Sequence, residues 1–370
     1  MQLRKYLFLF GLLALWFACA SKQHPSVEPL HLTEKAPLFV SFGIDDNPYS
    51  GLPESGGAGG IHYMTELFSI DHKLHYSFYV NTKYISDDSA EDADLVKRSW
   101  KEAIDYGNEI GVHTHSHPHG RNFTVEEWEG EMLLCLAHLM ASSQLALPRS
   151  QLIGFRTPFL EYGDSTFTAA QKTGFVYDCS IEEGYQADQN GTNFIWPYKL
   201  DRGSPGNSAT FQVLSLPFVM PHPGLWELPV YVFIVPPDNL AQQYGVQPGL
   251  RARLKERNDY FDLEQGKITG MDWNLWFEYG MDQTEFLATL KYTLDLHLQG
   301  NHCPFTVGLH SAIYSDRSPE PPPQTSVQQR RDALKEFVEY AMSKPEVKIV
   351  SAKELLDCMR TTGAARAGTQ

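Results

Sequence analysis

The sequence has little that would suit a membrane-spanning or a nucleic-acid-binding protein. After the first twenty residues, no apolar run is long enough to form a membrane helix. Basic residues are also scarce, with 30 Lys and Arg against 45 Asp and Glu and a formal net charge of −15 at pH 7. Because an acidic surface repels phosphate backbones, we do not expect nucleic acid as a partner.

Cysteine is sparse as well, with five in 370 residues. Beyond Cys19, the four cysteines are widely spaced and match no Cys-x-x-Cys zinc ribbon. An exported protein of this size can carry one or two disulfides, and Cys303 with Cys358 is one candidate pair. Spacing alone leaves the connectivity open.

The chain lacks a Gly-, Ser- or Pro-rich linker in its middle, and it has no internal repeat. Its one proline cluster, residues 319–323, is too close to the C-terminal helix to separate two domains. We therefore predict a single domain over residues 37–360, preceded by a linker at 21–36. The small, polar tail at 361–370 is expected to be disordered.

The first twenty residues have the pattern of a secretory signal. Two basic residues precede a short apolar run, residues 6–17, which is followed by an Ala-Cys-Ala cleavage pattern. Removal of residues 1–20 would leave 28 basic against 45 acidic residues, a net charge of −17. In the alternative interpretation Cys19 becomes the lipidated N-terminus of a lipoprotein, which the bulky Trp16 and Phe17 disfavour. We expect a secreted or periplasmic protein.

Strand-like and helix-like patterns alternate along the rest of the chain. Helices are predicted at 61–68, 90–106, 125–142, 165–172, 284–299, 326–343 and 352–359, and strands at 37–44, 74–81, 107–112, 151–155, 175–177, 226–235, 305–309 and 347–350. Apart from the strand at 226–235, residues 182–272 look like a long irregular insertion rich in Gly, Pro and Asn. Such strand–helix repeats imply βαβ units around a parallel sheet or barrel.

A histidine cluster follows the predicted strand that ends near Val112. Four of the fourteen histidines fall in seven residues, 113–119, within the run Gly-Val-His-Thr-His-Ser-His-Pro-His. Two histidines four residues apart can bind one ion, and neutral imidazole is the commonest metal ligand of this kind. The alternative is a solvated tract that binds metal adventitiously. From this stretch alone, both interpretations stay open.

Two adjacent carboxylates, Asp45 and Asp46, follow the first apolar strand directly. Catalytic loops of barrel enzymes begin at such a point, and neighbouring carboxylates can divide their roles between metal ligand and free base. The structural alternative is an Asx turn that closes the strand. For an isolated Asp-Asp pair this alternative would be the better one.

Arg156 and His310 also come directly after apolar strands. An arginine at a strand end can orient a buried carboxylate through two hydrogen bonds, although an ordinary surface arginine has the same local pattern. A lone histidine after an apolar run is more often structural than catalytic. Neither residue indicates an active site by itself.

The order of these signals along the chain is more specific than any one of them. Strand-Asp-Asp, Gly-x-Glu-Ile-Gly-x-His-Thr-x-x-His-Pro, Arg-x-Pro-Phe and Leu-His together resemble the polysaccharide deacetylases of the NodB-homology family, carbohydrate esterase family 4. The resemblance covers residues from about 37 to 360. The later part is most similar to the chitin-deacetylase branch typified by arthropod enzymes, through the segments 175–181, 196–198, 226–227 and 306–316.

This resemblance implies a zinc-type divalent metal site. Asp46, His113 and His117 would be the metal ligands, and Asp45 would be the general base. His115 and His119 have the same spacing, but Glu-Ile-Gly before the first register and a proline after it favour His113 and His117.

The resemblance also implies the roles of the residues around the metal. Arg156 would hold the base, and the N–H of Phe159 would help to bind the oxyanion. His310 would be the general acid, with Leu309 and Trp196 lining the acetyl pocket. The implied fold is α/β, a distorted (β/α) barrel of the polysaccharide deacetylase type in a single domain with a long irregular insertion.

The chain departs from the family pattern at three places. The family usually has Thr-Phe-Asp-Asp-Gly, whereas here the acidic pair is followed by Asn47, and Phe159 stands where the family has Tyr. The family's fourth motif, an Asp and a Trp that tune the acid, has no clean counterpart. Asp178 or Asp201 with Trp196 are candidates.

The expected activity is hydrolysis of N-acetyl groups from a chitin-like polysaccharide or oligosaccharide that contains N-acetylglucosamine. Peptidoglycan is an alternative substrate, and a catalytically silent sugar-binding relative is an alternative protein. An allantoinase-like amidohydrolase is disfavoured by the secretory signal and by aromatics suited to sugar stacking, such as Tyr198 and Trp226. A protein that only buffers metal would leave the Asp-Asp and Arg-x-Pro patterns unexplained. The oligomeric state stays open.

Overall fold

The structure is a computed structural model that describes residues 37–86, 91–205, 218–321 and 325–364. The predicted signal, the linker and Cys19 lie outside these residues. The described residues form one compact unit. Among the described helices, none is long and apolar enough to cross a membrane.

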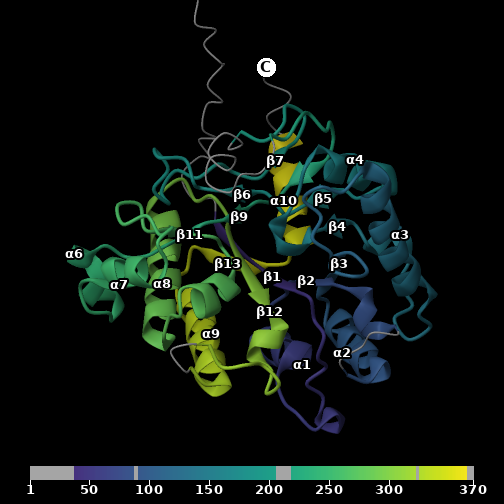
Figure 1. The fold of residues 1–370 in the computed structure, drawn as a ribbon, viewed down its shortest axis with the longest axis horizontal. Coiled ribbons are helices and arrows are strands. Elements are labelled where there is room, and N and C mark those ends of the chain that lie inside the picture. Colours follow the sequence, from purple (N-terminus) through teal and green to yellow (C-terminus); the bar gives the residue numbers. More distant parts are fainter. Residues whose placement is uncertain (1–36, 87–90, 206–217, 322–324, 365–370) are drawn as a thin grey trace, which may run out of the picture. The chain divides into compact units, whose positions relative to one another are not determined.

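The fold is built around one parallel sheet, whose strands run in the order β12-β1-β2-β3-β4-β5-β8-β7, with β13 paired to β1 (Figure 1). Among the described strands of this sheet, only β7 and β8 pair in an antiparallel manner. The strands are β1 (Leu38–Asp45), β2 (Ser77–Val80), β3 (Glu109–Val112), β4 (Gly154–Phe155), β5 (Tyr177–Asp178), β7 (Tyr198–Lys199), β8 (Trp226–Glu227), β12 (Phe305–His310) and β13 (Val347–Val350). Two small sheets add β6 (Glu182–Glu183) with β9 (Val230–Tyr231), and β10 (Phe233–Ile234) with β11 (Lys267–Ile268).

Helices surround the sheet and alternate with its strands (Figure 1). The α-helices are α1 (Gly60–Met64), α2 (Ala93–Asp105), α3 (Val125–Ala141), α4 (Asp164–Thr173), α6 (Asp238–Ala241), α7 (Leu250–Arg257), α8 (Gln283–Gln299), α9 (Val327–Met342) and α10 (Ala352–Ala364). The structure also contains two π-helical segments, η2 (Thr65–Asp71) and η7 (Asn274–Glu278). The short 3₁₀ turns are η1 (Pro53–Ser55), η3 (Thr82–Ile85), η4 (Arg149–Gln151), η5 (Pro158–Leu160), η6 (Gln242–Tyr244) and η8 (Ser311–Tyr314). This is the predicted distorted (β/α) barrel.

Local sequence signals explain where the main helices begin. Thr124 and Glu127 form a reciprocal capping box at the start of α3, and Asp282 with Glu285 does the same for α8. Each box satisfies backbone N–H groups that the first helical turn leaves without partners. The buried faces then pack on the sheet, as where Phe337 of α9 meets strand residues edge-on.

Successive side chains of β12 point to opposite faces of the strand, and those on one face belong to the main hydrophobic core. Phe305, Val307 and Leu309 belong to the main hydrophobic core. Thr306 lies on the opposite face of the strand, where its hydroxyl donates to Pro229 O at 2.6 Å, and the N–H of Gly308 donates to Gly270 O at 2.9 Å. These bonds attach the inserted segment along β12, the first strand in the order of the sheet.

The structure differs from the sequence predictions in detail. The strand predicted at 226–235 is divided into β8, β9 and β10, and the segment expected to be irregular contains α6 and α7. Helix α10 runs to Ala364, four residues into the predicted disordered tail, and residues 365–370 lie outside the described residues. The candidate disulfide between Cys303 and Cys358 is not formed, because neither sulfur takes part in a disulfide bond.

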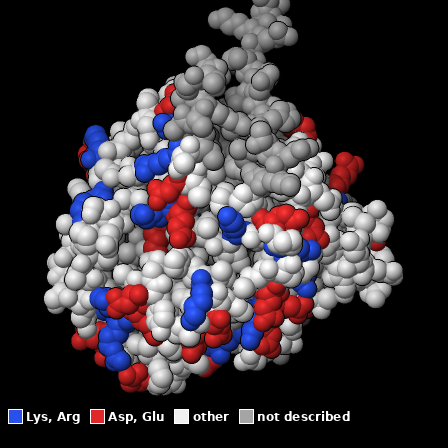
Figure 2. All heavy atoms as spheres, turned by 180° about the vertical axis from the view of Figure 1, so that it is seen from behind, with Lys and Arg blue, Asp and Glu red and all other residues white. Residues whose placement is uncertain are grey.

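The charges on one face of the molecule are mixed. Figure 2 shows acidic and basic side chains interspersed among uncharged ones, with no extended field of one sign on the part of that face that is described. Such a face gives a nucleic acid no basic track to follow.

Candidate active site

The site lies at the carboxyl ends of four parallel strands. Asp45 ends β1, His310 ends β12, and these two residues are register partners across the strand pair. His113 comes directly after β3, and Arg156 comes directly after β4. Because the strands are parallel and adjacent, their carboxyl ends bring these four side chains to one edge of the barrel.

The turn after β1 depends on Asp46 and Asn47. Both adopt positive φ angles, 68° and 63°, which Asp and Asn tolerate better than most residues. The buried Asn47 amide donates to Ile44 O at 2.9 Å and to Tyr79 O at 3.0 Å. These bonds explain how asparagine replaces the glycine expected after the acidic pair and still fixes the turn.

Asp46, His113 and His117 form a cluster in which one ligand atom from each lies within 4.8 Å of the others. Asp46 Oδ1 is 3.6 Å from His113 Nε2 and 3.1 Å from His117 Nε2. This oxygen is buried and accepts no well-directed hydrogen bond from the described residues. An orphaned carboxylate oxygen facing two imidazole nitrogens fits a divalent cation with nitrogen and oxygen ligands.

Contacts behind the cluster prepare His113 as a ligand. Its Nδ1 lies 2.8 Å from Arg156 O, so a proton on Nδ1 donates to this carbonyl and leaves the Nε2 lone pair for a metal. Burial lowers the pKa of His113 to about 4. Burial would raise the pKa of Asp46, but the imidazole of His117, with His310 and His113, holds it well below its usual value. His113 is therefore neutral and Asp46 ionised at neutral pH, as metal binding requires.

The loop that carries the two histidines is strained. Thr114 and His117 have φ angles of 71° and 58°, and a positive φ at a β-branched residue is unusual. The Asn81 amide donates to His113 O, and the Thr114 hydroxyl accepts the N–H of His117 at 3.2 Å. Strain of this kind, on the order of 1–3 kcal/mol per residue, persists only where neighbouring groups hold it, and it is common at functional sites.

Asp45 forms a buried ion pair with Arg156, whose Nη1 lies 2.9 Å from Asp45 Oδ1. Arg156 also donates from Nε to Cys179 O at 2.9 Å and lies over the Tyr79 ring. The absence of a side chain at Gly43 makes room for this arrangement, since a Cβ there would lie 2.8 Å from Arg156 Nη2. Arg156 thus holds Asp45 in one orientation at the same strand ends as the cluster of Asp46, His113 and His117.

His310 is held by Asp272, a residue that the sequence analysis did not select. His310 Nδ1 lies 2.7 Å from Asp272 Oδ1, and Asp272 Oδ2 accepts the His310 N–H at 3.0 Å. Burial would lower the pKa of His310, but the Asp272 carboxylate raises it to about 9. The neighbouring Trp273 was the available signal, because the family's fourth motif pairs an Asp with a Trp. The two aspartates considered from the sequence have other partners. Asp178 accepts a hydrogen bond from the Ser180 N–H, and Asp201 accepts one from the Gly224 N–H.

Phe159 occupies the turn after Arg156, in the short helix η5. Its φ and ψ of 56° and 12° are left-handed, and its side chain is 53% exposed. The turn is closed by the N–H groups of Leu160 and Glu161, while that of Phe159 donates to none of the described residues. Leu160, together with Val230 and Met271, forms a small apolar cluster separate from the main core. This cluster adjoins Phe159 and Asp272 in the chain.

Leu309 and Trp196, which were expected to line an acetyl pocket, both lie in hydrophobic clusters of buried residues. Leu309 is fully buried in the main core because adjacent strand residues face opposite sides, so it points away from the His310 side of β12. Trp196 packs with Phe194 and Cys303, and its indole N–H donates to Asn301 O at 3.2 Å. Cys303 precedes β12, so Trp196 lies toward the opposite end of that strand from His310.

The two remaining histidines of the cluster have other partners. His115 Nδ1 lies 2.9 Å from the Thr82 hydroxyl, and its ring stacks on His138. His119 stacks on Phe159, with ring centroids 3.9 Å apart and planes 10° apart. The structure therefore places the His113–His117 register, rather than the His115–His119 register, beside Asp46.

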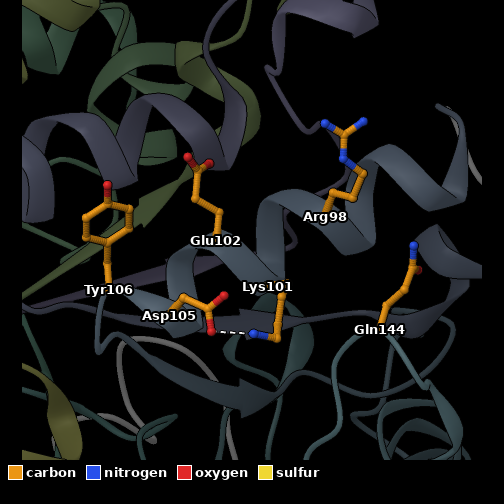
Figure 3. A pocket seen from close by; sticks show the side chains of 6 residues that line it. All are labelled: Arg98, Lys101, Glu102, Asp105, Tyr106 and Gln144. Atoms are coloured by element: carbon orange, nitrogen blue, oxygen red, sulfur yellow. Dashed lines mark hydrogen bonds and ion pairs between the residues drawn. The ribbon is translucent and has the colours of Figure 1, made fainter.

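A separate surface hollow of about 390 Å³ is associated with α2 rather than with this site (Figure 3). Figure 3 shows Lys101 and Asp105 paired with each other one turn apart on α2, and Arg98 is paired with Glu54. Its charged groups thus neutralise one another, and none of its lining residues belongs to the cluster at the strand ends. The lining residues are Arg98, Lys101, Glu102, Asp105, Tyr106 and Gln144.

Comparison with known proteins identifies a family for part of the sequence. Residues 67–177 match the family model described as polysaccharide deacetylase. The matched range includes His113, His117 and Arg156, but not Asp45, Asp46 or His310. No curated protein matches the chain at a significant level.

Solved structures resemble the fold at low sequence identity. A Mycobacterium smegmatis protein assigned as a polysaccharide deacetylase is 14% identical over 90% of this chain and 94% of its own, with a TM-score of 0.49. The allantoinase PuuE is 16% identical with the same coverage and a TM-score of 0.48. A carbohydrate esterase family 4 pseudoenzyme from Bacillus anthracis is 11% identical over 86% of this chain and 66% of its own, with a TM-score of 0.41. These likenesses do not distinguish an active from an inactive relative.

Proposed function

Because the chain belongs to the polysaccharide deacetylase family, we propose that it removes N-acetyl groups from N-acetylglucosamine-containing polysaccharide or oligosaccharide and releases acetate. The observation that carries the proposal is the cluster of Asp46, His113 and His117 beside the register pair Asp45 and His310. In support, the Asp45 carboxylate, which is paired with Arg156, and the His310 imidazole end neighbouring strands at the same edge as this cluster. This is the arrangement needed for metal-assisted amide hydrolysis.

The proposed cofactor is a divalent cation, most simply Zn²⁺, held by Asp46, His113 and His117. Two imidazoles and one carboxylate are a ligand set typical of catalytic zinc, which keeps a position open for water or substrate. Bound there, the ion would polarise the acetamide carbonyl and lower the pKa of a water molecule from 15.7 to about 7. The contact of His113 with Arg156 O fixes one ligand in the tautomer that such an ion needs.

In the proposed reaction, the side chains of the chain move two protons. Asp45, oriented by Arg156, accepts a proton from water as the oxygen of that water attacks the carbonyl carbon. The N–H of Phe159 stabilises the oxyanion that develops on the carbonyl oxygen. The carbon–nitrogen bond then breaks while His310 donates its proton to the departing amine. The products are acetate and a free amino sugar, and the water supplies the atoms that the two products gain.

The proposed domain and location follow from the sequence pattern. Residues 1–20 would be a signal peptide removed on export, residues 21–36 a linker, and residues 37–360 the catalytic domain. A secreted or periplasmic enzyme would meet polysaccharide outside the cytoplasm. Sequencing the N-terminus of the exported protein tests this, because a mature chain that begins at Ser21 supports secretion, whereas fatty acid on Cys19 shows a lipoprotein.

The deciding experiment measures acetate release from chitin, chito-oligosaccharides and peptidoglycan, with and without a chelator. We expect release from at least one chitin-like substrate, loss of it with the chelator, and recovery on adding Zn²⁺. Asp45→Asn is the matched inactive control. Sugar binding without acetate release on any substrate would identify the silent relative, and release from peptidoglycan alone would identify the alternative substrate.

A further inference from the structure

We propose that His119 and Glu161 are positioning residues, which hold the Phe159 turn against the metal-binding loop and so fix the Phe159 N–H. This inference rests on the proposed function, in which that N–H stabilises the developing oxyanion. Neither side chain touches the metal cluster directly, and neither is needed to bind the ion. Their effect would be to keep one hydrogen-bond donor at a constant distance from the reacting carbonyl.

The first contact is between two rings. His119 lies parallel to the Phe159 ring at 3.9 Å, with 10° between the planes. The second ring in contact with Phe159 is that of His117, which meets it edge-on with 4.5 Å between the ring centroids and 70° between the planes. Phe159 is thus in contact with two imidazoles of the same loop, one a proposed metal ligand and the other not. Aromatic pairs of these geometries are favourable beyond the area they bury.

The second contact is made by Glu161, two residues after Phe159. Its carboxylate accepts the N–H of Arg121 at 3.2 Å, and Oε1 lies 3.4 Å from His119 Nδ1. The Arg121 side chain adds a longer ion pair at 3.8 Å. The turn after β4 and the loop after β3 are therefore joined at two neighbouring points, one at the Phe159 ring and one at the Glu161 carboxylate.

The Phe159 turn needs this support because its own structure provides little. Phe159 and Leu160 have consecutive positive φ angles, 56° and 53°, which side chains other than glycine rarely adopt. The Phe159 side chain is half exposed, so the core does not hold it. Without the loop across it, the residue would be free to return to an ordinary backbone conformation, and its N–H would turn away.

The loop that provides the support is itself anchored. Gly120 lies between the two residues that contact the turn, and a Cβ at this position would lie 2.1 Å from the Trp128 ring. Trp128 is fully buried at the start of α3. The close approach of backbone to ring fixes the path of the segment, so His119 meets Phe159 from a rigid base although its own side chain is exposed.

The test compares His119→Ala with His119→Phe, which restores a flat ring, and uses His115→Ala as the control. His115 lies on the same loop but contacts Thr82 and His138 instead of Phe159. Zinc content, kcat, KM and the affinity of the zinc protein for acetate are measured for each. In ¹⁵N-phenylalanine-labelled protein, the Phe159 amide resonance is identified by its absence in Phe159→Tyr.

We expect His119→Ala to keep its zinc and its KM but to lose about 10-fold in kcat, a fraction of the 10²–10³ that removing an oxyanion donor costs. Its Phe159 amide resonance should shift and broaden, and its acetate affinity should fall. His119→Phe should recover most of all three properties, and His115→Ala should match the wild type. Glu161→Gln should give a smaller loss of the same kind.

Wild-type kcat and an unchanged Phe159 amide resonance in His119→Ala would overturn the proposal. Equal losses in His119→Phe and His119→Ala would also overturn it, because stacking would then not be the reason. If the wild-type protein releases no acetate from any substrate, the proposed function fails instead. The amide resonance still decides whether His119 holds the turn.

Discussion

Asp272 forms two hydrogen bonds with His310, one from the ring Nδ1 at 2.7 Å and one from the backbone N–H at 3.0 Å. Together they fix the ring orientation and place the proton-carrying Nδ1 on the carboxylate. The Nε2 atom is then the one available to a substrate. Because the carboxylate raises the pKa of His310 to about 9, the imidazole is protonated at neutral pH, as a general acid must be.

We predict that Asp272→Asn lowers the upper limit of the pH range in which the enzyme works. Asparagine keeps the shape of the side chain but removes the charge that raises the pKa of His310, so the acid loses its proton at lower pH. Wild-type activity should fall as the pH rises through about 9, or below that value when a divalent cation adds positive charge nearby. In Asp272→Asn this decline should begin at lower pH, which kcat measured from pH 5 to 10 would show.

Zinc content distinguishes this effect from loss of the metal. Asp272→Asn and His310→Ala should both keep their zinc, because neither residue belongs to the cluster of ligand atoms. His310→Ala should lose the alkaline decline altogether and on the order of 10²–10⁴ in rate, the usual contribution of a positioned proton donor. An unchanged pH profile in both variants would show that His310 is not the acid.

The second prediction concerns the metal ligands. Asp46→Ala, His113→Ala and His117→Ala should each lose zinc and activity, whereas His115→Ala should keep both. The reason is geometric, since only the first three side chains offer ligand atoms within 4.8 Å of one another. Zinc per protein chain, measured after exhaustive dialysis, checks the prediction. A full complement of zinc in His113→Ala would show that the ligand set is wrong.

Much of this site could be predicted from sequence because its residues follow strands directly. Asp45, His113 and Arg156 come at or just after apolar strands, and parallel strands bring such positions to one edge. The choice of His113 over His115 rested on flanking residues, and the cluster with Asp46 is the one that the structure brings together. Here the local pattern and the fold agree.

The sequence was least informative where the tertiary structure determines which side chains lie next to each other. Asp272 lies in the long insertion and follows no strand of the main sheet. No strand-like pattern in the sequence therefore predicted that it lies beside His310. Trp196 was selected for its ring and its likeness to the family, but its position in the barrel depends on an insertion whose path the sequence does not reveal. Leu309 could have been excluded, because strand alternation turns a neighbour of His310 to the other face.

The third prediction separates the two adjacent aspartates. Asp45→Asn should bind zinc near-stoichiometrically and yet deacetylate orders of magnitude more slowly, because Asp45 is paired with Arg156 and lies outside the ligand cluster. Asp46→Asn should lose zinc and rate together. Zinc content and acetate release are measured on both proteins. The opposite pattern would reverse the two roles, and near-normal rates in both would refute the mechanism.

The fourth prediction concerns Gly43, which leaves room for the Arg156 guanidinium. In Gly43→Ala, a Cβ would lie 2.8 Å from Nη2 of an arginine that is buried and cannot move aside freely. We expect loss of about 1–3 kcal/mol in the free energy of unfolding, typical of an overpacked core, and a fall in kcat as Asp45 loses its partner. Gly130→Ala, at an exposed helical position with open space around it, is the control and should be stabilising. Denaturant titration and kcat measure both effects.

The last prediction concerns a pair of carboxyl groups beneath the site. Asp178 and Glu227 are register partners on β5 and β8 and are fully buried, and Glu227 Oε2 accepts no hydrogen bond from the described residues. Burial raises the pKa of Asp178 to about 6 and that of Glu227 well above its usual range. The folded protein therefore holds protons that the unfolded chain gives up near pH 4, and stability must fall as the pH rises from there through 6 and beyond.

Glu227→Gln removes one of these ionisations and keeps both a donor toward Asp178 and an acceptor for the Ile181 N–H, which lies 3.1 Å from Glu227 Oε1. Its melting temperature should therefore decline less steeply than that of the wild type between pH 4 and 8 and should be the higher of the two at pH 8. Asp105→Asn, a change at an exposed ion pair, should leave the slope unchanged because solvent already screens that charge. A wild-type slope in Glu227→Gln would mean that the pair is not protonated in the folded protein.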